Sequence, residues 1–343
     1  MRHLLLPQVP IVFYCHFPDL LLARGRESAL KRLYRVPFDT LEEFSMSYSD
    51  AVAVNSNFTK GIVASTWPRL ANHVTTQVVY PCVDTDVKPT ETTLPDFLSP
   101  NDKIILSINR FERKKDIDLA IKAYAAIPTA SRKGVRLVIA GGYDKRVSEN
   151  VEYLTELQAL ADSLSLTHDA CTPSGSISIK NPKAEVLFLC SVPGPLKSTL
   201  LHKSRLLVYT PSNEHFGIVP LEAMLANLPV LAANTGGPVE TVLDGVTGWL
   251  REPDDSKAWS DVMAEALALT PDQKQKMGED GAQRVKDLFG RDQMAMTLDN
   301  IIQEGVTSRK GAKAGLGFGV LVLGLLAGLA AVAAAAIALF LNH

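Results

Sequence analysis

The sequence is poor in the features that mark secreted or nucleic-acid-binding proteins. Its 343 residues contain four cysteines, Cys15, Cys82, Cys171 and Cys190, and no two of them form a CxxC pair. Spacing this wide suits neither a zinc site nor a disulfide framework, so we expect free thiols in a reducing compartment. An excess of one charge is also lacking, because 35 Lys and Arg stand against 37 Asp and Glu. The near balance argues against nucleic acid as a partner.

The N-terminus lacks a convincing signal peptide. Pro7 and Pro10 interrupt its apolar residues, and no small-residue cleavage site follows. The chain instead runs directly into residues 11–15, which have the composition of a buried strand. The sequence therefore begins as if in the middle of a domain.

Charge disappears near the C-terminus. Residues 315–341 contain no charged side chain, and about 20 apolar residues are enough to cross a bilayer. Arg309, Lys310 and Lys313 precede this run, which places residues 1–313 in the cytosol by the positive-inside rule. We expect residues 306–343 to form a basic flank and a transmembrane tail anchor, with a buried soluble helix as the alternative.

Between the termini, short apolar runs alternate with helical patterns, which is typical of α/β proteins with parallel sheets. Strands are predicted at residues 11–15, 51–55, 76–79, 103–108, 136–140, 185–189, 206–209 and 229–232. Helices are predicted at residues 29–35, 117–125, 150–164 and 219–226.

Two domains are expected from this pattern. Residues 81–100 are rich in Pro, Thr and Asp and are predicted to link a domain at 1–88 to one at 89–305. The second domain has strands and helices enough for a Rossmann-like fold, which binds its ligand at the carboxyl ends of the strands. Residues 168–182 are turn-rich and are predicted to form a variable surface loop.

Polar clusters follow several predicted strands of the second domain. Asn109 and the cations Arg110, Arg113, Lys114 and Lys115 follow the first strand. Arginine and lysine bind phosphate oxygens well, so this cluster indicates a diphosphate site, although a solvated basic loop would look similar.

Two glutamates and two glycine pairs occupy the other strand ends. Glu214 and Glu222 lie on either side of Gly217, and carboxylates bind the paired hydroxyls of a sugar. The pairs Gly141-Gly142 and Gly236-Gly237 permit close approach of the backbone to a ligand. Each signal is weak alone, but four strand ends that converge on one crevice indicate a nucleotide-sugar site.

In the first domain, His16 lies just past a predicted strand and could face the same crevice, or it could be structural. Asp84-Thr-Asp86 and Asp116-Ile-Asp118 match the Asp-x-Asp pattern of metal diphosphate sites. Both pairs stand in turns or at a helix start, so capping and turns are the preferred interpretation.

Together these motifs resemble the retaining glycosyltransferases of family 4, which have two Rossmann-like domains of the GT-B type. The Glu214-x7-Glu222 element, SINRFERKKD and Gly236-Gly237-x-x-Glu240 carry the resemblance to the family. FYCHFPDLLL and AGGYDKRVSENVEY are similar to the mannosyltransferases of the dolichol pathway. The resemblance covers most of residues 11–290.

The resemblance implies roles for individual residues. Arg110 and Lys115 would neutralise the diphosphate of GDP-mannose, Glu222 would hold the ribose hydroxyls, and Glu214 the mannose hydroxyls. His16 would approach the donor sugar from the first domain, which makes His16 and Glu214 the expected catalytic residues.

The other donor-binding positions that the resemblance implies contribute backbone groups or small side chains. They are Asn109, Gly141, Gly142, Phe216, Gly217, Ile218, Gly236 and Gly237. No metal or other cofactor is expected, because cations and helix N-termini can stabilise the leaving group. A front-face retaining mechanism is the working hypothesis, since the sequence identifies no carboxylate nucleophile.

The implied reaction transfers mannose to a dolichyl-diphosphate-linked oligosaccharide through α-1,3 and α-1,6 linkages. It would take place on the cytosolic face of the endoplasmic reticulum membrane, with other early mannosyltransferases of the pathway as further partners.

The chain departs from the family at its beginning. The family starts with a strand and a glycine-rich loop that have no counterpart here, so we expect an incomplete N-terminal domain and a truncated sequence. Two alternatives stay open. One is an inactive, membrane-anchored scaffold, and the other is a transferase that uses another nucleotide sugar, such as UDP-GlcNAc.

Overall fold

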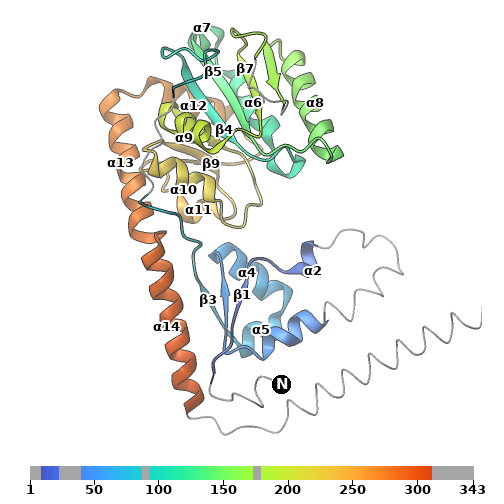
Figure 1. The fold of residues 1–343 in the computed structure, drawn as a ribbon, viewed down its shortest axis with the longest axis vertical. Coiled ribbons are helices and arrows are strands. Elements are labelled where there is room, and N and C mark those ends of the chain that lie inside the picture. Colours follow the sequence, from blue (N-terminus) through green and yellow to red (C-terminus); the bar gives the residue numbers. More distant parts are fainter. Residues whose placement is uncertain (1–8, 23–39, 87–92, 173–178, 311–343) are drawn as a thin grey trace, which may run out of the picture.

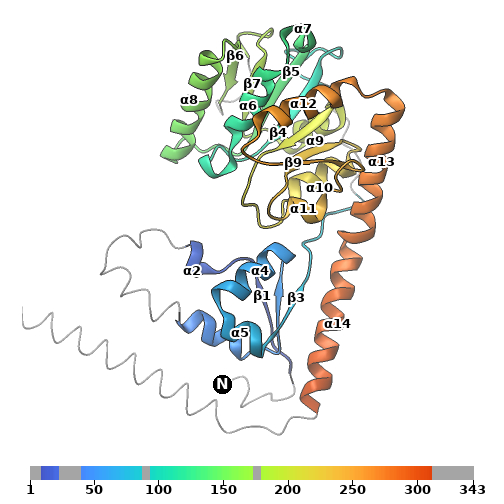
Figure 2. The ribbon, with the colours of Figure 1, turned by 180° about the vertical axis from the view of Figure 1, so that it is seen from behind.

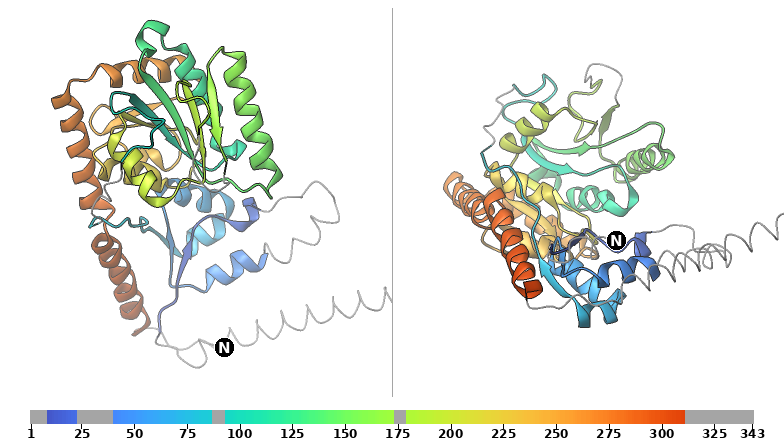
Figure 3. Two further views of the ribbon diagram at one scale, coloured as in Figure 1. Left: turned by 45° about the horizontal axis from the view of Figure 1, so that its top comes forward. Right: turned by 60° about the horizontal axis from the view of Figure 1, so that its bottom comes forward.

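The computed structural model describes residues 9–22, 40–86, 93–172 and 179–310. These residues form two parallel sheets with their own helices, and the two sheets lie apart in Figures 1 and 2. Figure 3 shows the same elements from two further directions. The described residues are therefore α/β, as predicted.

The first sheet has three strands in the order β1-β2-β3. Its strands are β1 (Val12–Cys15), β2 (Ala51–Val54) and β3 (Thr75–Val78), and the helices beside them are α2 (Asp19–Leu22), residues 40–47, α4 (Asn57–Thr66) and α5 (Pro68–His73). Val52 and Val54 pack on Val63, Trp67 and Leu70, so α4 and α5 cover one face of the sheet.

The second sheet has seven parallel strands in the order β10-β9-β8-β4-β5-β7-β6. They are β4 (Lys103–Ile108), β5 (Val135–Gly141), β6 (His168–Cys171), β7 (Val186–Cys190), β8 (Leu206–Tyr209), β9 (Val230–Ala233) and β10 (Gly248–Arg251). After β4 the chain forms β5, then the edge strand β6, and then β7 between β5 and β6. It then crosses to the other side of β4, where it forms β8, β9 and β10 in turn. This reversal creates a topological switch point between β4 and β8.

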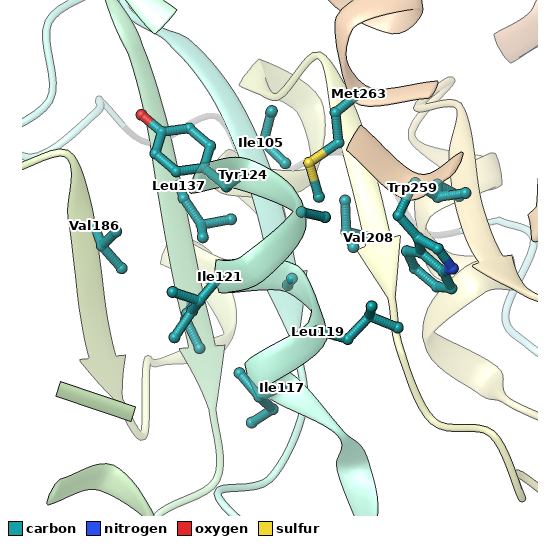
Figure 4. Packing of buried hydrophobic residues seen from close by; sticks show 14 of the residues in the cluster. Ile105, Ile117, Leu119, Ile121, Tyr124, Leu137, Val186, Val208, Trp259 and Met263 are labelled. Atoms are coloured by element: carbon teal, nitrogen blue, oxygen red, sulfur yellow. The ribbon is translucent and has the colours of Figure 1, made fainter. Parts of the chain in front are cut away.

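Helices cover the two faces of the second sheet. They are η1 (Arg113–Lys115), α6 (Ile117–Ala126), α7 (Thr129–Arg132), α8 (Ser148–Ser163), α9 (Gly194–Lys203), α10 (Ile218–Leu225), α11 (Pro238–Thr241), α12 (Ser256–Ala268) and α13 (Pro271–Leu288). Side chains of α6, α8 and α12 form one core with Ile105, Leu137 and Val208 (Figure 4). Alternate residues of the same strands point to α9, α10 and α13 on the other face.

The last described helix, α14 (Arg291–Lys310), leaves the second sheet and lies beside the first. It continues from α13 along one side of the molecule (Figures 1 and 2). Its Ile301 is buried against Ala51, Ala53 and Val79. The domain boundary predicted at residue 305 therefore falls inside a helix that packs on the first domain.

Each of the eight strands predicted from the sequence overlaps a strand of the structure, and the predicted helices at 117–125, 150–164 and 219–226 overlap α6, α8 and α10. The prediction of a loop over 168–182 was wrong for residues 168–171, which form the edge strand β6 beside β7. Its polar start, His168-Asp169, hides it from a search for apolar runs. The strand β10 was also missed, because it has four residues and follows directly on a turn.

Some predictions concern residues that the structure does not describe. The helix at 29–35, the domain boundary at 88 and the transmembrane run 315–341 lie outside the described residues. Among the helices that are described, none is long and apolar enough to cross a membrane.

Candidate functional site

The switch point between β4 and β8 joins two polar loops. The Lys115 ammonium, in η1 after β4, lies 2.6 Å from the Glu214 carboxylate in the loop after β8. The Thr210 hydroxyl donates to the Lys115 carbonyl at 2.7 Å, and Ser212 donates to Asp116 at 2.9 Å. These contacts hold the two loops together at the place where the topology predicts a ligand.

Glu214 has a second partner, the hydroxyl of Tyr209, which donates to the same oxygen, Oε2, at 2.8 Å. Burial raises the pKa of the Glu214 carboxyl, but Lys115 and the hydrogen bonds lower it further, so the pKa lies below its ordinary value. Burial and the neighbouring Glu214 raise the pKa of Tyr209 well above its usual range. Glu214 is therefore an anion and Tyr209 a neutral donor near neutral pH.

Glycines let the loops approach this closely. Gly141 ends β5 at φ +151°, and a Cβ atom there would stand 1.8 Å from the Asn109 carbonyl oxygen. Gly236 has φ +69°, and a Cβ there would stand 2.5 Å from the carbonyl oxygen of Glu214. A Cβ on Gly237 would stand 2.2 Å from the Cα of Phe216. Larger residues at these positions would push the loops apart.

The N-terminus of α10 completes this side of the site. Gly217 caps the helix at φ +86°, and Ile218 begins it with 46% of its side chain exposed. The Phe216 side chain is buried beside Tyr80 and Phe289, which leaves its backbone as the part that can meet a ligand. The backbone roles expected for residues 216–218 stay a prediction.

Glu222, in the same helix, is paired with a lysine that the sequence analysis did not single out. The Lys197 ammonium of α9 lies 2.5 Å from the Glu222 carboxylate, and both side chains are about one-third exposed. The two residues are 25 positions apart. Only the packing of α9 beside α10 reveals the pair.

The basic cluster after β4 is divided by the structure. Arg113 points to α8, where its guanidinium binds Glu152 and Glu156 at 3.1 and 2.6 Å. The prediction of four cations at one site was therefore wrong for Arg113. Arg110 is exposed and pairs with Glu112 at 2.8 Å, and its side chain lies against Gly142. Lys115 is the cation that contacts Glu214.

The end of β1 lies next to the loop after β8. His16 is exposed, and its carbonyl accepts a hydrogen bond from Asn55 at 3.1 Å. The next residue, Phe17, stacks on His215 with ring centroids 3.8 Å apart. Because His215 directly follows Glu214, this stack brings the His16 backbone and Glu214 to the same rim of the two domains.

A second bridge between the domains comes from Glu240. Its carboxylate accepts hydrogen bonds from the backbone N–H groups of Asn57 and Phe58 at 2.9 and 3.0 Å, and from the Tyr80 hydroxyl at 2.9 Å. Asn57 and Phe58 open α4 of the first domain, where N–H groups have no partner within the helix. Glu240 thus binds two N–H groups at the start of a helix in the other domain, beside the N-cap residue Ser56, whose side chain accepts from Thr59. The place of Glu240 in the Gly236-Gly237-x-x-Glu240 motif does not reveal this role.

The side chains of the two Asp-x-Asp pairs bind other groups of the protein. Asp84 accepts a hydrogen bond from the backbone N–H of Asp86 at 3.1 Å and pairs with Arg291 at 2.5 Å. Asp116 accepts from Ser212, and Asp118 binds Lys122 at 2.7 Å. Within the described ranges, no group of three His, Cys, Asp or Glu side chains is arranged to hold a metal ion.

Several curated relatives of the chain are named alpha-1,3/1,6-mannosyltransferase. The chain is 51% identical to an alpha-1,3/1,6-mannosyltransferase of Neurospora crassa over 97% of its length. The corresponding enzymes of Schizosaccharomyces pombe and Saccharomyces cerevisiae are 46% and 42% identical over 89% and 88% of the chain. The chain spans 71%, 60% and 62% of the lengths of these three proteins.

A family model matches the second domain, and solved structures share the fold. Residues 91–284 match the family described as glycosyl transferases group 1. The fold is similar to sucrose-phosphate synthase from Thermosynechococcus elongatus, with a TM-score of 0.65 and 20% identity over 87% of this chain and 68% of that one. It is also similar to Anabaena HepE, solved with UDP and glucose, with a TM-score of 0.62 and 20% identity over 85% of this chain and 72% of that one.

Proposed function

Because the chain belongs to the alpha-1,3/1,6-mannosyltransferase family within the group 1 glycosyltransferases, we propose that it transfers mannose from GDP-mannose to a dolichyl-diphosphate-linked oligosaccharide. The products carry α-1,3 and α-1,6 linkages, as the names of the relatives say of those enzymes. The observation that carries the proposal is the Lys115–Glu214–Tyr209 cluster at the switch point.

In this proposal the donor lies across the carboxyl ends of β4 and β8. Lys115, with Arg110 at the rim, neutralises the diphosphate as it departs, and the N-terminus of α10 contributes backbone N–H groups. Glu222 binds the ribose hydroxyls. No metal takes part, because these positive groups stabilise the leaving group.

Glu214 has the electrostatic character of a sugar-binding group. Lys115 and Tyr209 hold it as an anion, and both of them bind Oε2. The other oxygen, Oε1, would accept mannose hydroxyls. A carboxylate compensated in this way is a weak nucleophile, which supports front-face transfer with retention, in which the departing phosphate takes the proton of the acceptor hydroxyl. His16 faces the donor sugar from the first domain.

A transfer assay tests the donor. Purified full chain in detergent is given a dolichyl-diphosphate-linked acceptor and radiolabelled GDP-mannose or UDP-GlcNAc. We expect label to enter the lipid fraction from GDP-mannose and not from UDP-GlcNAc. Transfer from UDP-GlcNAc alone would identify a different donor, and no transfer from either would favour an inactive scaffold. Retention is tested by determining the anomeric configuration of the new linkage. A covalent mannosyl adduct on Glu214 would contradict the front-face mechanism.

We also propose that residues 315–341 anchor the chain in the endoplasmic reticulum membrane with residues 1–313 in the cytosol. The uncharged run and the cations before it support this orientation. An acceptor in the same membrane would then lie within reach, and early mannosyltransferases of the pathway would be neighbours. Alkaline carbonate extraction of the full chain, compared with a chain ending at residue 310, tests the anchor. Release of the full chain by carbonate would exclude it.

A further inference from the structure

A charged cavity lies at the edge of the seven-stranded sheet opposite the donor site. It has a volume of about 490 Å³ and lies where β4, β5 and β7 begin. Asp102 precedes β4, Glu185 precedes β7, and Arg136 belongs to the start of β5. Seven-residue β5 runs from this cavity toward the donor site, which places the two roughly 20 Å apart. Figure 1 shows α7, beside the cavity, at the end of the molecule away from the first sheet.

Arg136 is buried in the wall of this cavity, and some of its guanidinium hydrogen-bond donors have no partner among the described residues. The residue is 8% exposed. Its Nη1 donates to the Pro182 carbonyl at 2.9 Å and lies 3.5 Å from the Asp102 carboxylate. Its Nε and Nη2 atoms have no hydrogen-bond partner among the described residues. An arginine stays charged inside a protein, and buried donors are normally satisfied.

Arg132 repeats this pattern a short distance away. Its side chain is 11% exposed and lies over the ring of Tyr124, with the guanidinium carbon 5.5 Å from the centroid. Its Nη1 is 3.5 Å from the Glu185 carboxylate, longer than a charge-assisted hydrogen bond. Nε and Nη1 have no hydrogen-bond partner in the part of the chain that the structure describes.

The charges around the cavity do not cancel. Arg132, Arg136, Lys133 and Lys183 line it together with the two carboxylates of Asp102 and Glu185, which leaves two positive charges in excess. The two lysines are exposed at the rim, where they raise the local concentration of anions. Four guanidinium nitrogens below this rim, two in Arg132 and two in Arg136, are buried and have no hydrogen-bond partner among the described residues. Arginine is the usual protein ligand of an oxyanion.

From these observations we propose that the cavity binds the phosphate group of a small phosphomonoester in solution. Phosphate offers oxygens in several directions, so it can bond to Arg132 and Arg136 together, whereas a planar carboxylate would satisfy one fork. The volume lies within the range of small-molecule sites, so it leaves room for the organic part of such a ligand. The site is separate from the donor site and does not depend on the proposed transfer reaction.

Inorganic phosphate is the probe for the test, which uses full chain in detergent at constant ionic strength set with sodium chloride. Isothermal titration compares wild type, an Arg132→Gln/Arg136→Gln variant and a Lys115→Ala variant, in which the donor site is damaged. We expect saturable binding in wild type and Lys115→Ala, and affinity lower by about tenfold or more in the double variant. Equal binding by wild type and the double variant, or no saturable binding by wild type, would overturn the proposal.

A variant of the two rim lysines provides a second test, in case the double arginine variant fails to fold. Lys133→Ala/Lys183→Ala changes exposed side chains, so the fold should survive, and phosphate should bind several-fold more weakly. Unchanged affinity in this variant would overturn the proposal. Flotation with phosphatidylcholine vesicles, with and without phosphatidylinositol 4-phosphate, separates the two sources of phosphate. We expect wild type and the arginine variant to float to the same extent. A solution ligand would be contradicted if flotation with the phosphoinositide required the arginines while free phosphate did not bind.

Discussion

The two sheets differ in how far each depends on residues from the other domain. The seven-stranded sheet has strands on both sides of β4, helices on both faces, and the Lys115–Glu214–Tyr209 cluster within its own residues. The three-stranded sheet has α4 and α5 on one face, but its other face is covered by α14 from the far end of the chain. The first two N–H groups of its helix α4 are bound by Glu240 from the second domain.

This difference separates two kinds of substitution. Changes in the donor cluster should alter turnover and leave the cohesion of the domains intact. Changes at Ile301 or Glu240 should loosen the first domain and leave the second sheet folded. The following predictions test that separation, from the largest expected effect to the smallest.

Lys115→Ala should lower the rate of mannosyl transfer by about 100- to 1,000-fold, because it removes a preorganised positive charge from the leaving group. The matched control is Lys114→Ala, whose side chain is exposed and paired with Glu112. Initial rates with GDP-mannose measure the effect, and thermal unfolding checks the fold. Near-normal turnover in Lys115→Ala would remove this residue from the phosphate site.

Ile301→Ala should destabilise the first domain by about 2–4 kcal/mol, since it leaves a cavity in the core between α14 and β2. The adjacent Ile302 is 42% exposed, so Ile302→Ala is the control and should have little effect. Hydrogen exchange locates the change, with faster exchange expected in β2 and unchanged exchange in β5. Equal acceleration in both sheets would show that the two domains unfold as one unit.

Glu240→Gln should cost about 1–2 kcal/mol, because an amide cannot replace a carboxylate that accepts bonds from two helix N–H groups and a tyrosine. Glu279→Gln on the exposed face of α13 is the control. The denaturation midpoint and hydrogen exchange at the start of α4 measure the effect. Unchanged exchange at Asn57 and Phe58 would show that the cap contributes nothing to domain contact.

The sequence predicted those features that depend on strand ends. The meeting of Lys115 with Glu214 follows from the rule that parallel strands deliver their C-terminal loops to one edge, and the family resemblance named the same residues. The glycines at 141 and 236 were predicted to let the backbone approach a ligand, whereas the close approach that the structure shows is to the backbone of Asn109 and Glu214.

Features that depend on packing between distant elements could not be predicted. Arg113 and Lys115 have the same chemistry in the sequence, but the acidic face of α8 takes the first and Glu214 takes the second. The Lys197–Glu222 pair arises from the placement of α9 beside α10. Glu240 is an ordinary motif residue until the first domain places the start of α4 against it.

The smallest expected effect is on the stability of the fold at low pH. The pKa of Glu214 is lower in the folded chain than its ordinary value, because Lys115 and Tyr209 outweigh burial. A depressed pKa adds stability that is present above the ordinary value and is lost as pH falls through the folded value. The unfolding temperature of wild type should therefore fall more steeply below the ordinary range of a glutamate than that of Glu214→Gln. Because the group belongs to the second sheet, hydrogen exchange in acid should rise first in the loops after β4 and β8. Identical acid dependence in the two proteins would mean that the Lys115–Glu214 pair is not maintained in solution, and the donor cluster of the second domain would then lose its main electrostatic support.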